Sequence, residues 1–505
     1  MLRTVYNFFF LCLVLLVTSC SLNRDPLDSF SDVTEGVDQS GQQVAFKDKA
    51  AVQNHLQTIY RQMRDRQEHW YVDLLLIADA HADNAYAGTT GAEVVPFENN
   101  TIEGSNSVLL RDWNRYMEDI AKANLLIVNI DSVDDNALTT AERAQMKGEA
   151  KIFRALVLFD MVRIWGDIPV ITTIAGDITS ETIGDVYDDY FPAQNTELEA
   201  YLQIEKDCLE AIETAPQSSA SDKTLFSKSV AKALLAKVYA EKPLRDYNKV
   251  IQYADELAAD GFELTTDYND LFGMNAAITD TKMRNTSESI LEAQFFSGNG
   301  NWATWMFGRD LTNYDNSFTW AKWITPSRDL IKAFNDQGDA VRMNESIVYY
   351  ATSWSNYYPS SNYPFMFKLR SAYSSIIKLR YADILLLKAE ALIQGPSQNL
   401  AGAAQIIDRV RARVELPPLT SVVKSSPESM LTALLTERRL ELAFEGQRWF
   451  DLVRLDKVEP VMNAVYGKDS GRIKQVYPFN SASYRLPIPQ TVIDQNPKIV
   501  QNPGY

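Results

Sequence analysis

Apolar residues recur every three or four positions over most of this chain, and this period constrains its fold more than any other feature. In residues 141–165, Met146, Ala150 and Phe153 lie on one apolar stripe, and Gly166 follows the segment. Such a stripe predicts an amphipathic helix, and glycine commonly ends one. The same pattern predicts helices at 35–66, 113–125, 198–214, 227–240, 250–259, 381–393, 403–414 and 427–444.

Small side chains occupy positions where neighbouring helices can cross, as at Ala155, Ala231 and Ala389. Consecutive helical pairs with small residues at their contacts are typical of tetratricopeptide-like stacking, in which each pair packs on the next. The strict repeat signature is absent, so the repeats are degenerate. The sequence therefore predicts a mainly α fold, a superhelix of tetratricopeptide-like helical pairs.

Residues 262–380, named the excursion below, interrupt the helical pattern. They are rich in Gly, Asn, Ser, Thr and aromatic residues and show little helical period. We therefore expect a long irregular segment that leaves the helical scaffold. Long segments of this kind often carry binding residues, because the scaffold holds them at the surface.

The first 41 residues predict a leader and a tether rather than part of the folded body. Arg3 precedes an apolar run over residues 8–17, which is too short to span a bilayer and indicates a signal peptide. The run ends in Val-Thr-Ser-Cys, which resembles a bacterial lipobox. We expect residues 1–19 to be removed, Cys20 to be lipid-modified, residues 20–41 to form a tether, and residues 42–505 to fold as one helical domain.

Charge and cysteine content exclude several classes of protein. The formal net charge is -17, and an acidic surface repels phosphate backbones, so nucleic acid is not an expected partner. The three cysteines, two of them in the leader, allow neither a disulfide framework nor a paired zinc motif. Cys208 lies in a predicted helix, where we expect it to be a buried small residue.

No catalytic, metal or cofactor motif stands out in the sequence. Asp79, His81 and Asp83 alternate and could offer three ligands to a metal, but no further ligand is evident nearby, and a solvated polar loop explains them better. No carboxylate pair suggests a glycosidase, and the nucleophile-elbow, zinc-protease, P-loop and dinucleotide-binding motifs are absent. We expect no catalytic residues and no cofactor.

Aromatic residues gather in the excursion. Five of the nine tryptophans lie there, at Trp302, Trp305, Trp320, Trp323 and Trp354, and tyrosines accompany them, among them those at positions 314, 349, 350, 357, 358 and 363. A sugar ring stacks its apolar face on an aromatic ring, while its hydroxyls need directed polar partners such as the interleaved Asn, Asp and Arg. The alternative is a structural role, in which these rings are buried and attach the excursion to the core.

Four stretches together resemble the SusD/RagB family of outer-membrane nutrient-uptake lipoproteins. They are a helix ending in Trp-Gly-Asp-Ile-Pro at 165–169, Arg-Tyr-Ala-Asp at 380–383, Glu-Arg-Arg-Leu-Glu-Leu-Ala-Phe-Glu-Gly-Gln-Arg-Trp at 437–449, and a closing pair, Leu-Pro-Ile-Pro at 486–489 with Gln-Asn-Pro-Gly-Tyr at 501–505. The third and fourth are the most specific. Residues 262–368 match only loosely, as expected for the part that determines ligand specificity.

The resemblance implies a protein that binds nutrients and does not turn them over. It implies a scaffold of four tetratricopeptide-like units that packs on a SusC-like TonB-dependent outer-membrane transporter, where the protein serves as a lid and captures the ligand. It also implies a location at the outer membrane, lipid-anchored and exposed at the cell surface. The ligand surface would be built from the excursion and the loop Asp83–Ser107, and the residues we expect to contact a glycan are Tyr86, Trp302, Trp305, Trp320 and Trp323.

Three functions remain open at this point: capture of a glycan, capture of a peptide or another nutrient, and hydrolysis at the cell surface. A peptide site would favour backbone hydrogen bonds over stacking. Arg438, Glu441, Glu445 and Arg448 are spaced for ion pairs along one helix face, which favours a structural role. The prolines after residue 486 stiffen the chain end, and a tail strapped across the body is expected.

Overall fold

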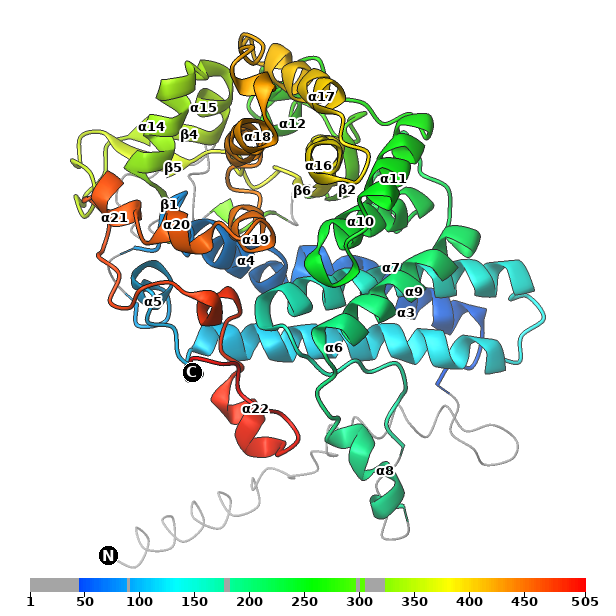
Figure 1. The fold of residues 1–505 in the computed structure, drawn as a ribbon. Helices are drawn as coiled ribbons and strands as arrows, with labels where there is room; N and C mark the ends of the chain where they lie inside the picture. The colour runs from blue at the N-terminus through cyan, green and yellow to red at the C-terminus, as the bar shows by residue number, and fades with distance from the viewer. Residues whose placement is uncertain (1–44, 89–90, 177–181, 297–299, 305–322) are drawn as a thin grey trace, which may run out of the picture.

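The computed structural model describes residues 45–88, 91–176, 182–296, 300–304 and 323–505 (Figure 1). The longer helices are α3 (Lys49–Asp65), α6 (Ser107–Asn129), α7 (Thr140–Trp165), α8 (Ile183–Tyr190), α9 (Glu197–Thr214), α10 (Lys228–Ala240), α11 (Tyr247–Ala259), α14 (Arg328–Gln337), α16 (Tyr381–Gln394), α17 (Leu400–Arg413) and α18 (Pro427–Glu441). The chain is mainly helical, as the apolar period predicts.

Short elements connect these helices. The remaining α-helices are α4 (Asp73–Leu75), α5 (Val95–Asn99), α12 (Asn269–Phe272), α15 (Ala340–Ser346), α19 (Arg448–Arg454), α20 (Val458–Met462), α21 (Val465–Lys468) and α22 (Gln490–Gln495). Two π-helical turns, η1 (Glu68–Val72) and η2 (Leu76–Ala80), flank α4. The 3₁₀ turns are η3 (Ile130–Ser132), η4 (Lys242–Leu244), η5 (Val423–Ser425) and η6 (Ser481–Tyr484).

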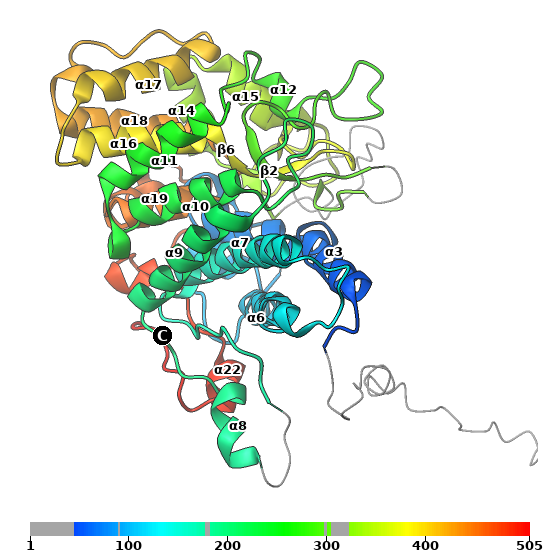
Figure 2. The ribbon, with the colours of Figure 1, turned by 90° about the vertical axis from the view of Figure 1, so that its right-hand side faces the viewer.

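The helices stack in chain order, as Figures 1 and 2 show. Helix α7 packs against α6 and α9, α10 packs against α9 and α11, and α16 packs against α11, α17 and α18. Each helix therefore covers the apolar stripe of its neighbours, which is how degenerate helical repeats bury a continuous core. Local signals fix the ends: a capping box at Thr139 opens α7, and Gly166, with φ 76°, closes it.

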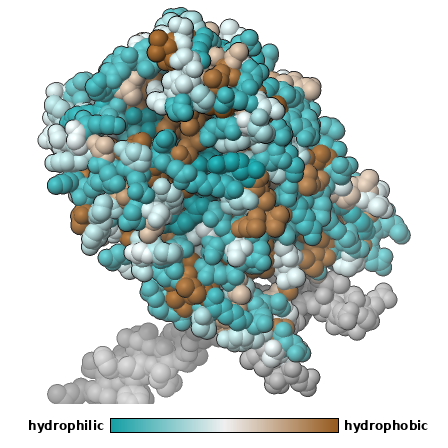
Figure 3. All heavy atoms as spheres, in the orientation of Figure 1, coloured by the Kyte–Doolittle hydropathy of each residue, from teal (hydrophilic) through white to brown (hydrophobic). Residues whose placement is uncertain are grey.

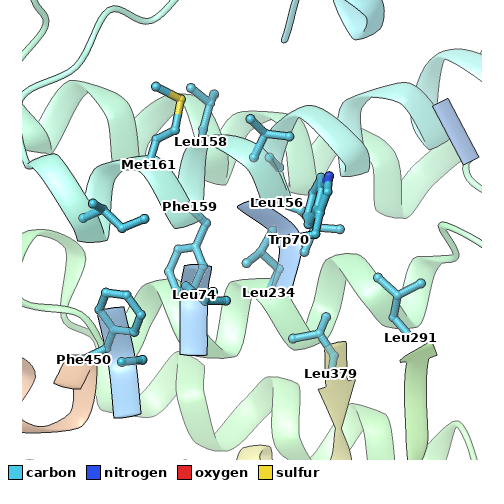
Figure 4. Packing of buried hydrophobic residues seen from close by; sticks show 14 of the residues in the cluster. Trp70, Leu74, Leu156, Leu158, Phe159, Met161, Leu234, Leu291, Leu379 and Phe450 are labelled. Atoms are coloured by element: carbon cyan, nitrogen blue, oxygen red, sulfur yellow. The ribbon is translucent and has the colours of Figure 1, made fainter. Parts of the chain in front are cut away.

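One hydrophobic core runs through the stack. Figure 4 shows Leu156, Phe159 and Met161 of α7 beside Leu234 of α10 and Phe450 of α19. Trp70 and Leu74 enter the same cluster from the π-helical region, and Leu291 and Leu379 enter it from two strands. Each fully buried side chain of this size stabilises the fold by about 1.5–3 kcal/mol.

The excursion is more regular than the sequence predicts. It contains α14 and α15 and several strands: β2 (Ser289–Ala293), β3 (Thr325–Pro326), β4 (Ile347–Tyr350), β5 (Tyr363–Met366) and β6 (Ile376–Arg380). Strands β4 and β5 form an antiparallel hairpin, β2 pairs with β6, and β3 pairs with β1 (Ala85–Tyr86). The strands are two to five residues long, too short for a clear two-residue period in the sequence.

The prediction of a solvated polar loop at residues 79–83 is wrong. Asp79, His81 and Asp83 are all buried, and each has a different structural partner. Asp79 accepts hydrogen bonds from the backbone of the α18–α19 connection, His81 contacts the Phe97 carbonyl at 2.7 Å, and Asp83 binds a guanidinium group of α19. Partners far away in sequence therefore bury a segment that looks polar on its own.

The charged residues of the 437–449 motif do not pair with one another, contrary to the sequence prediction. Arg438 binds Asp383 and Asp451, both at 2.8 Å, and Arg448 binds Asp83 at 2.7 Å. Glu441 and Glu445 accept hydrogen bonds from cations of other segments, including Arg380. These groups connect α18 and α19 to the rest of the body, so the predicted structural role is confirmed in a different form.

Helix α18 ends three residues earlier than predicted, at Glu441 rather than Phe444. The predicted N-cap is confirmed, since the Ser426 side chain accepts from the Ser429 amide. Phe444 lies in the left-handed region, with φ 60°, and its amide donates to the Asp79 carboxylate at 3.1 Å. That tertiary hydrogen bond takes the chain out of the helix.

The chain end lies across the body, as predicted. In the tail, residues 477–505, the Leu486 amide donates to the Ile164 carbonyl at 2.8 Å, and the Trp165 indole donates to the Pro487 carbonyl at 3.2 Å. Asn502 binds the Trp165 carbonyl at 2.8 Å. Cys208 is buried, as expected, and burial raises the pKa of its thiol. Within the described ranges, none of the helices has the length and apolar character needed to cross a bilayer.

Candidate ligand-binding site

The loop after Asp83 and the excursion meet in a two-residue sheet. Strands β1 and β3 pair antiparallel, with Tyr86 opposite Thr325 and Ala85 opposite Pro326. Ser327 strengthens the junction, because its hydroxyl donates to the Asp83 carbonyl at 2.7 Å. The two segments that the family resemblance assigns to the ligand surface therefore lie side by side.

Tyr86 lies beneath this junction rather than on its surface. Its side chain is 0% exposed, and its hydroxyl donates to Asp469 at 2.5 Å while accepting from the Arg328 amide at 2.9 Å. Its ring stacks on Tyr357, with the centroids 4.3 Å apart and the planes 21° apart. Burial raises the pKa of Tyr86, so it stays a neutral hydrogen-bond donor. The contact predicted between Tyr86 and a ligand finds no exposed surface here.

Tyr357 fastens the next part of the excursion to the loop. Its hydroxyl donates to Glu98 at 2.7 Å and lies 3.0 Å from the Gly88 carbonyl. Glu98 also accepts from the amides of Ala87 and Ile473, at 2.9 and 2.7 Å. Burial raises the pKa of Glu98, against the opposing effects of a nearby cation and these hydrogen bonds. The tyrosines in this layer hold the site together from below.

Arg328 and Tyr358 lie above this buried layer. The Arg328 guanidinium stacks over the Tyr358 ring, with its central carbon 4.3 Å from the centroid. The same guanidinium donates to the Tyr86 hydroxyl and the Tyr357 carbonyl. The Tyr358 hydroxyl donates to the Pro326 carbonyl at 2.8 Å. Both side chains are therefore held in fixed positions, and both remain partly exposed.

A surface hollow of about 450 Å³ opens beside these two residues, and we name it the tyrosine hollow. Helix α14 forms one wall, and the β4–β5 hairpin with its connection forms the other. Its lining residues combine two aromatic rings with amide, hydroxyl and cationic groups: Arg328, Ile331, Lys332, Asn335, Tyr349, Tyr358, Pro359, Ser361 and Asn362. Tyr349 is 36% exposed, so part of its side chain is open to the solvent. Such a surface can stack a sugar ring and hydrogen-bond its hydroxyls.

None of the described residues predicted to contact a ligand lines the tyrosine hollow. Trp302 and Trp323 are partly buried against the main core, while Trp354 is buried under the β4–β5 hairpin. Residues beside Trp302 are fastened to a different part of the body, because the Ala303 amide donates to the Gln67 side chain at 3.1 Å. Trp305 and Trp320 lie outside the described residues, as does Cys20.

Sequence reasoning placed Tyr349 and Tyr358 among the aromatic residues of the excursion but did not select them. It missed the polar wall of α14, formed by Arg328 and Asn335. The available signal was Ser327, a typical N-cap residue followed by an amphipathic segment, which identifies a helix inside the excursion. The face that this helix presents to the hairpin depends on tertiary contacts.

Across the described ranges, the structure places no group of three His, Cys, Asp or Glu side chains where they could share a metal ion. The face of the molecule in Figure 3 is mostly hydrophilic, with small hydrophobic patches separated by polar side chains. That surface fits an acidic body with a net charge of -17.

Two family models match adjoining parts of the chain. The model described as the SusD family matches residues 262–505. The model described as starch-binding associating with outer membrane matches residues 30–240. Between them they cover most of the sequence, and the second description links its family to the outer membrane.

Individual relatives agree with both family models. SusD-like protein P38 of Formosa agariphila is 28% identical over 445 residues, which cover 81% of this chain and 82% of that protein. A laminarin-binding SusD-like protein of known structure is 25% identical with a TM-score of 0.68, and the match covers 91% of this chain and 100% of that one. Surface glycan-binding protein A from Bacteroides thetaiotaomicron, solved with laminarihexaose, has a TM-score of 0.70 at 18% identity, covering 90% and 99%.

These similarities, with the stacked helices and the strapped tail, define a class of SusD-like proteins. The chain belongs to the SusD family. The fold class and the family resemblance predicted from the sequence are therefore confirmed. The names of both solved relatives describe them as binding proteins. Surface glycan-binding protein A is only 18% identical to this chain, so its similarity shows the fold alone.

Proposed function

We propose that this chain captures a glycan at the tyrosine hollow and delivers it to a TonB-dependent outer-membrane transporter of the SusC type. The observation that carries the proposal is the hollow itself, which combines the faces of Tyr349 and Tyr358 with Arg328, Asn335 and Asn362. Partly buried hydrogen bonds hold Arg328 and Tyr358 in place before any ligand arrives. Such preorganisation lowers the entropic cost of binding.

The relatives support a glycan as the ligand class. A SusD-like protein that is 25% identical to this chain is described as laminarin-binding, so β-glucans are the first neutral glycans to test. The predicted contacts from Trp302, Trp305, Trp320 and Trp323 remain part of the proposal. Tyr86 supports the surface instead, because its hydroxyl and ring hold Arg328 and Tyr357.

A glycan and peptide array tests the ligand class. We expect the folded body, beginning at residue 45, to bind one or more neutral oligosaccharides and no peptide. Replacing Tyr349 with Ala removes one stacking surface and should weaken that binding about tenfold. A matched control is Tyr187→Ala, which removes an exposed tyrosine from α8. Binding to peptides alone, or equal glycan binding by both variants, contradicts the proposed site.

Anchoring and delivery need a separate test in cells. We propose that Cys20 carries the lipid anchor and that the protein stays at the cell surface as a partner of its transporter. Cys20→Ala should abolish surface labelling and lipid incorporation while the purified body binds glycan with unchanged affinity. Equal lipid incorporation by the wild type and Cys20→Ala contradicts this assignment.

A further inference from the structure

A second hollow, of about 680 Å³, lies between residues 100–105 and the tail, and we name it the tail hollow. It is distinct from the tyrosine hollow. In Figure 1 the marked C-terminus lies just below α5, near one end of α6, whereas α14, β4 and β5 lie at the upper end of the molecule. The two hollows share no lining residue.

Hydrogen bonds hold the walls of the tail hollow in place. The Gln501 side chain accepts from the Ile488 amide at 2.7 Å and donates to the Ile488 carbonyl at 2.8 Å. The Gln490 amide donates to the Gly104 carbonyl at 2.8 Å, and the Asn100 side chain donates to the Tyr477 carbonyl at 3.0 Å. The cavity is therefore preformed.

Two exposed tyrosines border this cavity. Tyr477 is 62% exposed and Tyr505 is 43% exposed, and both line the cavity. Between them lie short polar side chains with amide and hydroxyl groups: Asn100, Thr101, Ser105, Asn480, Ser483, Gln490 and Gln501. Aromatic faces beside a ring of amides and hydroxyls are the groups that bind the two sides of a pyranose ring.

The charge of the lining selects among ligands. Among the described residues that line the tail hollow, Glu103 has the only charged side chain, and Lys, Arg and His are absent. A phosphate, sulfate or uronate group would find no cation there and would face a carboxylate. An uncharged polyhydroxylated ligand fits this lining.

We propose that the tail hollow is a second binding site, for a neutral glycan, that works independently of the tyrosine hollow. Its affinity comes from stacking on Tyr477 and Tyr505, and the fixed amides orient the sugar. Because both rings are exposed, their removal leaves the core and the tail hydrogen bonds intact, so variants at these positions keep the fold.

Saturation-transfer difference NMR with hexasaccharides of laminarin, starch, xylan and mannan tests this proposal. Four proteins are compared: the wild type, Tyr349→Ala/Tyr358→Ala, Tyr477→Ala/Tyr505→Ala, and the variant that combines all four changes. We expect the first double variant to keep residual binding to at least one hexasaccharide. Adding Tyr477→Ala/Tyr505→Ala to that variant should weaken the residual binding at least tenfold. Adding only Tyr477→Phe to it, which keeps the ring, should change the residual binding by less than about twofold.

Three outcomes would overturn the proposal of a second site. It is overturned if Tyr349→Ala/Tyr358→Ala retains no binding, a result that supports the tyrosine hollow. It is also overturned if residual binding is unchanged by the tail changes. A wild type that binds none of the four hexasaccharides overturns both sites. The exposed pair Tyr187→Ala/Tyr190→Ala in α8 is the matched control for removing two surface tyrosines.

Discussion

Glu441 joins several segments of the fold through its single carboxylate. It accepts from Arg342 of α15 at 3.0 Å and from Arg380, which precedes α16, at 2.6 Å, and it also pairs with Arg413 of α17. All four groups are nearly or fully buried. Burial alone would raise the pKa of Glu441, but the three guanidinium groups hold it well below its usual range.

Replacing Glu441 with Gln should therefore destabilise the protein strongly. The neutral amide keeps the shape of the side chain but removes the negative charge that three buried guanidinium groups share. Breaking a buried ion pair costs about 3–5 kcal/mol. Urea unfolding followed by circular dichroism measures the change. Asp336→Asn is the control, because its partner Lys332 is exposed and the loss should be under about 1 kcal/mol. Equal losses in the two variants refute a special role for Glu441.

Asp79 makes stability depend on pH in a defined direction. Burial is the dominant effect and raises the pKa of Asp79 from 3.8 to about 6, against opposing hydrogen bonds from Asn84, Phe444 and Gly446. A raised pKa means that the folded state binds the proton more tightly than the unfolded state. The stabilisation that this proton provides is complete below pH 4 and is lost as the pH rises through 6.

Comparing the wild type with Asp79→Asn isolates this effect. The amide does not titrate, so the difference in unfolding free energy between the two proteins should shift by about 2 kcal/mol between pH 4 and pH 7, with the wild type losing stability relative to the variant. Denaturant titrations at a series of pH values measure it. A constant difference across that range excludes a raised pKa at Asp79.

Helix α14 connects the body of the protein to the tyrosine hollow. Its N-cap residue Ser327 is buried, accepts from the Leu330 amide at 3.0 Å and donates to the Asp83 carbonyl at 2.7 Å. The helix then presents Arg328 and Asn335 to the hollow. One hydroxyl therefore fixes both the start of the helix and its position against the loop.

Ser327→Ala should lower stability by about 1–2 kcal/mol and weaken glycan binding without touching the ligand. Ser227, at the N-cap of α10, makes no capping bond with its side chain, so Ser227→Ala is the matched control. Thermal unfolding and titration with the same glycan measure the two effects. Equal stability losses in both variants argue against the capping role of Ser327.

The helices of the stack were predictable from sequence because their signals are local. Apolar stripes, Gly166 and the Ser426 N-cap lie within or beside the helices they define. The ligand surface was less predictable, because the β1–β3 pairing joins residues far apart in the chain. Tyr86 illustrates the limit: an aromatic residue in a polar loop suggests a binding surface, yet distant Asp469 and Tyr357 bury it.

Buried contacts join the two parts of the molecule that the two family models match. Asp83, from the first part, binds Arg448 of the second at 2.7 Å, and Asp79 receives backbone amides from the same region. The tail returns to α7, where Asn502 binds the Trp165 carbonyl. These buried contacts support the expectation of one folding domain over residues 42–505.

Calorimetry should therefore show a single unfolding transition with equal calorimetric and van't Hoff enthalpies. Residues 45–260 expressed alone should lack a cooperative transition. In this fragment, Asp79 and Asp83 lose their partners, and the C-terminal end of α7 is no longer covered by the tail. Two resolved transitions, or a fragment that unfolds cooperatively, contradict the expectation of one domain. The full-length body under identical conditions is the control.

We expect this SusD-family protein to bind a glycan at the tyrosine hollow without cutting it. The most direct test is calorimetric titration of the body with the best neutral oligosaccharide from the array, followed by chromatography of the recovered sugar. The titration should show saturable binding, and the recovered oligosaccharide should be intact. Tyr349→Ala and Tyr358→Ala should each bind about tenfold more weakly at unchanged melting temperature. Shortened products, or full affinity in both variants, would contradict this expectation.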